Sequence, residues 1–216
     1  MRLPMMARSR VSTLAVLALV GLVLTGCADA TAPKAAPWSE LSTSPFKPGD
    51  AQMALVGVSD GTYSFTIDPT HDQTLQFGAS GLYLPANSIC DLSSSSYGVS
   101  FWNDSCSVER SSVTITAVVR DAATDHPSVD FQPAMRFNPS KSVWLYLSVS
   151  NQATLDASRL VKYCNATGCV DESVTDASLK SYVDTKNKVV FRRIKHFSGY
   201  LVSTFAQVDD LVESLF

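Results

Sequence analysis

Residues 113–119 read Val-Thr-Ile-Thr-Ala-Val-Val, and residues 143–149 read Val-Trp-Leu-Tyr-Leu-Ser-Val. In both stretches apolar side chains occupy every second position, and residues 63–67 (Tyr-Ser-Phe-Thr-Ile) follow the same pattern. Successive side chains of a β-strand point to opposite faces, so this period predicts strands with one face buried in a core.

Shorter strand candidates, separated by turns rich in Gly, Pro, Asn and Ser, continue this pattern between residues 51 and 205. No stretch of this part shows a helical period of useful length. The pattern predicts one all-β domain, an antiparallel sandwich or barrel of a size that supports its own core. The shorter candidates are residues 74–77, 81–84, 129–131, 159–163, 189–194 and 200–205.

The last residues, 206–216, break the strand pattern. Apolar side chains at positions 208, 211, 212 and 215 follow helical spacing, and Asp209 and Asp210 stand near the start. Acidic residues favour the amino end of a helix, so we expect a short amphipathic helix that packs on the sandwich.

The amino-terminal residues have the layout of a secretory signal peptide. Arg2, Arg8 and Arg10 precede an apolar run over residues 14–24 that only Gly21 interrupts. The run is shorter than the roughly 20 apolar residues that a permanent membrane helix needs. We therefore expect residues 1–26 to be removed.

The residues Leu24-Thr25-Gly26-Cys27 end this run and resemble the bacterial lipoprotein signal: Leu, two small or polar residues, then Cys. The resemblance implies that the Cys27 thiol receives a diacylglyceryl group and that Cys27 becomes the first residue of the mature protein. It also implies a lipid anchor in the bacterial cell envelope, facing the extracytoplasmic side, with the membrane as a partner. The alternatives are an uncleaved apolar anchor and a soluble secreted protein.

Residues 27–50 read as a tether between this cysteine and the domain. Pro33, Pro37, Pro45 and Pro48 lie among small residues without a sustained apolar period. In extended polyproline geometry, at about 3.1 Å a residue, the 23 residues from 28 to 50 would reach roughly 70 Å. The tether predicts a domain held near the membrane.

The charge of the mature chain argues against nucleic acid as a partner. Removal of the three arginines of the signal leaves 14 basic and 20 acidic side chains, a formal charge of −6. Binding of a phosphate backbone needs concentrated basic charge, and Arg192 with Arg193 is too small a group.

Four cysteines remain once Cys27 is assigned to lipid. An even number in an exported domain predicts disulfides, and three connectivities are possible. We favour Cys90 with Cys106 and Cys164 with Cys169, because each pair is close in sequence and closes a turn-rich loop. A zinc site is the alternative, but Cys-Asn-Ala-Thr-Gly-Cys lacks the usual ligand spacing. We expect no metal and no cofactor.

Three separated motifs resemble ZU5-like domains, a family of β-sandwiches. Residues 81–89 (Gly-Leu-Tyr-Leu-Pro-Ala-Asn-Ser-Ile) are similar to its strand and Ile-Pro-Ala-Gly-Ala-Leu signature, residues 129–137 to its central Phe-x-Pro segment, and residues 196–200 to its closing His-Phe-Ser strand. Asn87 and Ser88 depart from the family's Gly and Ala. The resemblance implies a β-sandwich that acts as a non-catalytic structural or interaction module.

Some ZU5-like domains cut themselves within the His-Phe-Ser motif. The resemblance carries this possibility to His196, Phe197 and Ser198: the Ser198 hydroxyl would attack the Phe197 carbonyl, with His196 as general base. The other interpretation is a partly exposed His196 on a strand, Phe197 in the core and Ser198 facing solvent.

The loop over residues 91–105 is a candidate ligand site. Tyr97, Phe101 and Trp102 lie among Ser and Gly inside the predicted Cys90–Cys106 link, and such aromatic side chains can contact a glycan or an envelope protein. Alternatively, Tyr97, Val99 and Phe101 face the core as another strand. No motif of a conventional enzyme occurs, which favours an interaction module.

Overall fold

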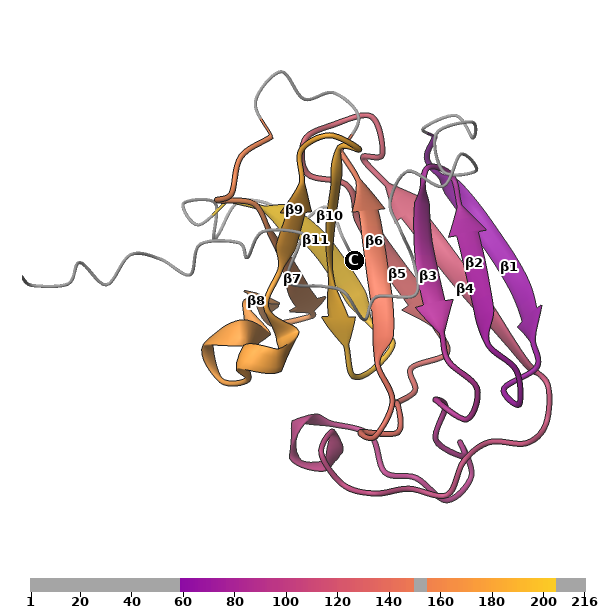
Figure 1. The fold of residues 1–216 in the computed structure, drawn as a ribbon. Helices are drawn as coiled ribbons and strands as arrows, with labels where there is room; N and C mark the ends of the chain where they lie inside the picture. The colour runs from indigo at the N-terminus through magenta and orange to yellow at the C-terminus, as the bar shows by residue number, and fades with distance from the viewer. Residues whose placement is uncertain (1–58, 150–154, 205–216) are drawn as a thin grey trace, which may run out of the picture. The chain divides into compact units, whose positions relative to one another are not determined.

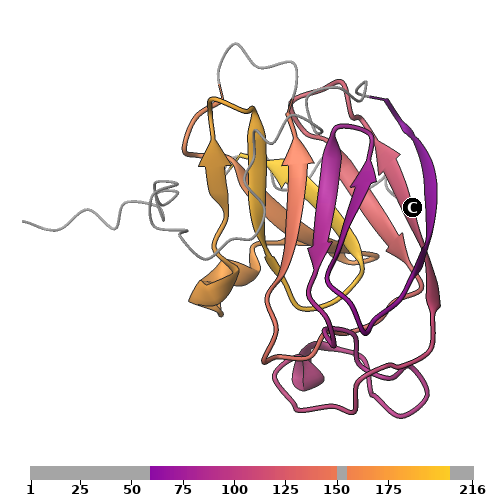
Figure 2. The ribbon, with the colours of Figure 1, turned by 45° about the vertical axis from the view of Figure 1, so that its right-hand side comes forward.

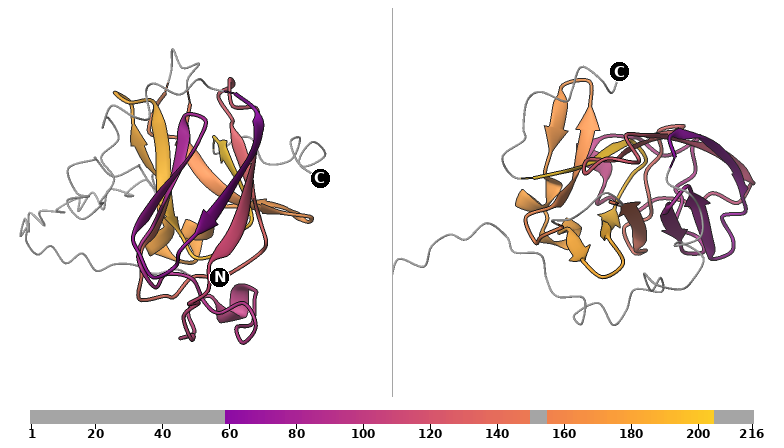
Figure 3. Two further views of the ribbon diagram at one scale, coloured as in Figure 1. Left: turned by 90° about the vertical axis from the view of Figure 1, so that its right-hand side faces the viewer. Right: turned by 90° about the horizontal axis from the view of Figure 1, so that it is seen from above.

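The computed structural model describes residues 59–149 and 155–204, which form two antiparallel β-sheets packed face to face (Figure 1). The all-β sandwich expected from the sequence is confirmed. The chain crosses between the two layers repeatedly: β1 joins one sheet, β2 and β3 the other, and β4 and β5 return to the first. Figures 2 and 3 show the two layers from further directions.

The larger sheet has six strands. In spatial order they are β1 (Gly61–Ile67), β4 (Val113–Arg120), β5 (Ser128–Gln132), β11 (Gly199–Ser203), β7 (Leu160–Asn165) and β8 (Gly168–Val170).

The smaller sheet has five strands, and within residues 59–149 and 155–204 three single-turn 3-10 helices lie in the connections. The strands, in spatial order, are β2 (Gln73–Phe77), β3 (Ser80–Leu84), β6 (Val143–Ser148), β10 (Val189–Ile194) and β9 (Tyr182–Asp184). The 3-10 helices are η2 (Val99–Phe101), η3 (Glu172–Val174) and η4 (Ala177–Leu179).

The alternating pattern of residues 113–119 places one face of β4 in the core, as predicted. Ile115 and Ala117 are fully buried, while Thr114 between its apolar neighbours is exposed. β4 pairs with β1 so that Phe65 lies opposite Ile115 and Ile67 opposite Val113. The register therefore aligns the apolar faces of the two strands.

Strand β6 departs from the predicted pattern because both of its faces are buried. Val143, Leu145 and Leu147 face the other sheet, and Trp144 and Tyr146 on the opposite face are buried as well. We call the rings on that face the outer aromatic cluster. Its members are Tyr83, Trp144, Tyr146, Tyr182 and Phe191.

Aromatic rings fill the centre of the sandwich. Phe131 stacks on Phe197 with ring centroids 4.7 Å apart, and Phe137 meets Phe197 edge to face at 4.9 Å. Phe197 is fully buried, as one interpretation of the His-Phe-Ser motif expected. This packing holds Phe197, the middle residue of the motif, in the core.

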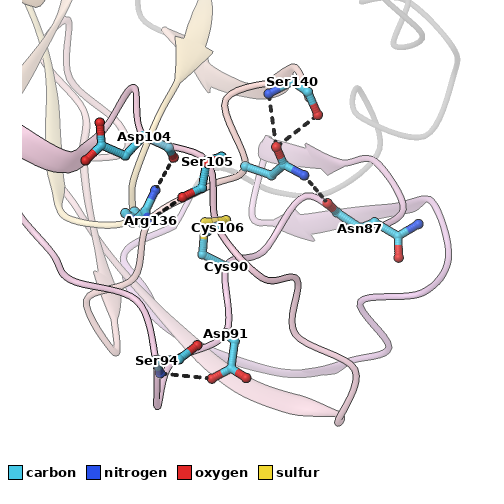
Figure 4. Close-up of a disulfide and its surroundings, with 10 residues drawn as sticks. Asn87, Cys90, Asp91, Ser94, Asp104, Ser105, Cys106, Arg136 and Ser140 are labelled. Atoms are coloured by element: carbon cyan, nitrogen blue, oxygen red, sulfur yellow. Dashed lines mark hydrogen bonds between the residues drawn. A yellow bond between two sulfur atoms is a disulfide. The ribbon is translucent and has the colours of Figure 1, made fainter.

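Both favoured disulfides are present. Cys90–Cys106 closes the loop after β3, and Cys164–Cys169 links β7 to β8. Figure 4 shows Arg136 beside the first disulfide, where its guanidinium donates to the carbonyl of Asp104 at 2.7 Å. The loop is thereby held to the sandwich by covalent and polar contacts.

The predicted signal peptide, Cys27, the tether over residues 27–50 and the helix over residues 206–216 lie outside the described residues. Among the residues that the structure does describe, no helix has the length and apolar character needed to cross a membrane.

Candidate functional site

A charged side chain lies between the two sheets. Arg192 on β10 shares the inward face of the strand with Val190 and Ile194, and it is fully buried. Its guanidinium donates to Glu172 Oε2 at 2.7 Å and to the Val161 carbonyl on β7 at 2.7 Å. Arg192 therefore links the five-stranded sheet to the six-stranded sheet and to η3.

Glu172 is the counter-ion and begins η3. The side chain of Asp171 caps this turn by accepting from the Ser173 backbone N–H at 2.9 Å. Burial raises the pKa of Glu172, but the hydrogen bond from His196 and the charge of Arg192 outweigh it and hold that pKa below its usual value. Glu172 is therefore ionised and serves two partners.

His196 is the second partner of Glu172. Its Nε2 lies 3.1 Å from Glu172 Oε1, and its ring stacks on Trp102 with centroids 3.8 Å apart. Burial lowers the pKa of His196, and Arg192 acts in the same direction against the opposing effect of Glu172. The ring is neutral at pH 7, and an ionised Glu172 selects the tautomer in which Nε2 carries the proton.

The other ring nitrogen of His196 faces two tyrosines. Nδ1 lies 3.4 Å from the hydroxyls of both Tyr97 and Tyr200. The Tyr200 hydroxyl donates to the His196 carbonyl at 2.6 Å, and the Tyr97 hydroxyl donates to the Phe197 carbonyl at 2.7 Å. Burial raises the pKa of Tyr97 to about 12, so this hydroxyl keeps its proton.

The structure brings together two sites that the sequence suggested separately. The aromatic loop supplies Tyr97 and Trp102, and the His-Phe-Ser motif supplies His196, Phe197 and Ser198. The expectation of a partly exposed His196 is wrong, because the loop folds over the ring and Trp102 covers one of its faces.

The expectation that Tyr97, Val99 and Phe101 form a core strand is also wrong. Residues Val99–Phe101 form the 3-10 helix η2, where the side chains of Val99 and Phe101 are exposed. The Tyr97 ring is partly exposed, and only its hydroxyl end is turned inward, to the Phe197 carbonyl. Gly98 has a φ of 131°, in the region that favours glycine, and it directs the chain into this turn. The buried ring of the loop is instead that of Trp102, which is 8% exposed.

A pocket of about 630 Å³ opens beside this network. The loop over residues 97–103 forms one wall, and β7, β8, η3 and η4 form the other. One disulfide closes the loop that forms the first wall, and the other links β7 to β8 in the second wall. The lining residues include the aromatic Tyr97, Trp102 and Tyr163, the apolar Val99 and Val170, and the polar Asn103, Asn165, Asp171, Glu172, Asp176 and Lys195.

Lys195 joins the two walls. Its ammonium group pairs with Asp176 and also donates to the Asn103 side chain. Burial raises the pKa of Asp176, but hydrogen bonds from Lys195 and Ser178 outweigh it and lower that pKa to about 2. Asp176 is therefore ionised above about pH 2, in the form that pairs with Lys195.

Phe101 does not line the pocket, whereas Tyr97 and Trp102, the other two aromatic residues of the predicted ligand loop, do line it. Sequence reasoning missed Glu172 and Arg192. Arg192 stands two residues from both Val190 and Ile194, so the strand period places its charge on the same core face, whereas no pattern marks Glu172.

No group of three His, Cys, Asp or Glu side chains in the described ranges could hold a metal ion.

No protein-family model matches the sequence, and neither a curated protein nor a solved structure matches it.

We predict that Glu172→Gln destabilises the domain by about 3–5 kcal/mol, because it leaves the buried Arg192 charge without its counter-ion. Urea denaturation of the purified protein measures the loss. Asp104→Asn is the matched control, since this carboxylate is exposed and its substitution should change stability by less than about 0.5 kcal/mol.

The double variant Glu172→Gln/Arg192→Met removes both charges. It should be less destabilised than the sum of its single variants, with a coupling of about 0.5–3 kcal/mol. A Glu172→Gln variant that loses no more stability than Asp104→Asn would contradict the assigned ion pair.

Proposed function

We propose that the protein is a lipid-anchored cell-envelope protein whose β-sandwich is a non-catalytic binding module, with the pocket beside Trp102 as its binding surface. The pocket itself carries the proposal: its lining includes the exposed apolar side chains of Val99 and Val170, and the Glu172 and Lys195 contacts hold its walls together. The Leu-Thr-Gly-Cys sequence and the two disulfides support export and anchoring through Cys27.

The state of the charged groups favours binding over catalysis. Glu172 is shared by Arg192 and His196, and Asp176 is paired with Lys195. His196 is fully buried beneath Trp102. A general acid or base must reach the substrate, whereas these groups are occupied in holding the pocket walls together.

The rim of the pocket favours a protein partner over a glycan. Val99 is 75% exposed and Val170 is 54% exposed, on opposite walls of the pocket. Asn103 and Asn165 also line the pocket, and both already hydrogen-bond within the protein, to Lys195 and to Tyr163 and Thr167. This mainly apolar lining suits a polypeptide segment with an apolar side chain. A sugar ring would need an open aromatic face, but Trp102 presents one face to His196 and is largely buried.

A photo-crosslinking amino acid at position 99 tests this proposal in intact cells. Full-length protein carrying it at Val99 should yield a defined adduct with an envelope protein. The matched control carries it at Val174, which is 81% exposed on η3 but does not line the pocket, and it should not yield that adduct.

The same experiment with Cys27→Ser tests the anchor. This variant should leave the membrane fraction and lose the adduct. Equal adducts from positions 99 and 174 would overturn the binding surface, and membrane retention of Cys27→Ser would overturn the lipid anchor.

Self-cleavage between Phe197 and Ser198 is a second candidate, favoured by the hydrogen bond from the Tyr97 hydroxyl to the Phe197 carbonyl. This bond would polarise the carbonyl, with His196 nearby as the proton acceptor. Attack by Ser198 Oγ would form an ester as the Phe197–Ser198 peptide C–N bond breaks. Water would then hydrolyse the ester, leaving a carboxylate on Phe197 and the hydroxyl on Ser198.

Intact mass under denaturing conditions decides this candidate. Self-cleavage predicts a released fragment of 19 residues, from Ser198 to Phe216, which is absent in Ser198→Ala and reduced in Tyr97→Phe. A single uncut species of the wild type would eliminate self-cleavage and leave the binding module in place.

A further inference from the structure

The outer aromatic cluster lies on the face of the five-stranded sheet that points away from the other sheet. Tyr146 stacks on Phe191 with ring centroids 5.5 Å apart, and Phe191 stacks on Tyr182 at 5.5 Å. Trp144 lies 6.2 Å from Phe191 in a tilted arrangement. Three neighbouring strands, β6, β10 and β9, thus carry a continuous aromatic surface.

These rings are more deeply buried than we expect for side chains on the outward face of a sheet. Tyr146 and Phe191 are 0% exposed and Trp144 is 4% exposed. Every member of the cluster comes from the five-stranded sheet itself, and the six-stranded sheet packs on the opposite face. Within the described ranges no strand lies over the cluster, so a segment outside these ranges is a candidate for its cover.

One segment outside the described residues has matching chemistry. Residues 33–48 contain Trp38, Phe46 and four prolines, at positions 33, 37, 45 and 48. Proline-rich segments adopt an extended polyproline conformation and dock on rows of Tyr and Trp rings, because the ordering costs little and the rings match the proline faces. Residues 150–154 lack any large apolar side chain, and residues 205–216 contain no proline.

The chain can reach the cluster from its point of entry. The described part begins at Ser59, and β1 lies beside β2, an edge strand of the five-stranded sheet (Figure 1). Ten residues separate Pro48 from Ser59, and an extended chain of that length spans about 35 Å. This reach extends across several strands at about 4.8 Å a strand.

We propose that residues 33–48 dock on the outer aromatic cluster of the same molecule, with Trp38 and Phe46 among its rings. The docking does not depend on the proposed function. If Cys27 is lipidated, the docking shortens the tether to residues 28–32, about 15 Å in extended form instead of roughly 70 Å. The sandwich would then sit close against the membrane surface.

Crosslinking in the full chain tests which segment covers the outer aromatic cluster. Benzoylphenylalanine in place of Phe46 should crosslink within one molecule to peptides of β6 or β10. The control places it at Phe216, which should give no such product. Crosslinks from Phe216 to β6 or β10 would assign the cluster to the carboxyl-terminal residues, and dimer-sized products from position 46 would assign it to a second copy; either result overturns the proposal.

Peptide binding provides a second test that does not require substitution in the sandwich. A labelled peptide of residues 33–50 should bind the full-chain variant Trp38→Ala/Phe46→Ala at least tenfold more tightly than the wild type, whose own segment occupies the cluster. A peptide carrying the same two substitutions should not bind. Equal binding of the unchanged peptide to both proteins, or no binding to either, would overturn the proposal.

Discussion

The burial of one guanidinium group constrains the arrangement around the pocket. Arg192 points between the sheets because it lies on the same, inward face of β10 as Val190 and Ile194. A charge in that environment needs a counter-ion and hydrogen bonds, which Glu172 and the Val161 carbonyl supply. The position of η3 follows from this requirement, since η3 must carry the carboxylate inward.

The same carboxylate organises the opposite wall of the pocket. Glu172 holds His196 through Nε2, and the flat, neutral ring of His196 provides the surface on which Trp102 stacks. Tyr97, from the same loop, is fixed by its bond to the Phe197 carbonyl. Replacement of such a network by apolar side chains often costs no stability. Its value here lies in the defined geometry it gives to a loop that lacks strand structure.

Some of this architecture follows from local sequence, and some does not. The alternation in β1 and β4 and the short cysteine spacings were sufficient to predict strands and disulfides, because both depend on near neighbours in the chain. The burial of Trp102 depends on its contact with His196, far along the sequence, and the Glu172–Arg192 pair is equally non-local. The three-residue strands β8 and β9 were missed because they are too short to show a period.

The protonation state of His196 tests most directly whether an ionised Glu172 holds a neutral ring in the core. Because burial keeps the pKa of His196 below its usual value of about 6.5, the unfolded chain binds a proton first, and stability should fall as pH drops below about 6.5. Nitrogen-15 NMR of the imidazole, assigned by loss of the signal in His196→Asn, reports the state directly. We predict a mainly neutral ring protonated at Nε2 in the folded protein at pH 6.5, where an ordinary histidine is half protonated. A protonated His196 at that pH, or a proton on Nδ1 instead, would contradict the account.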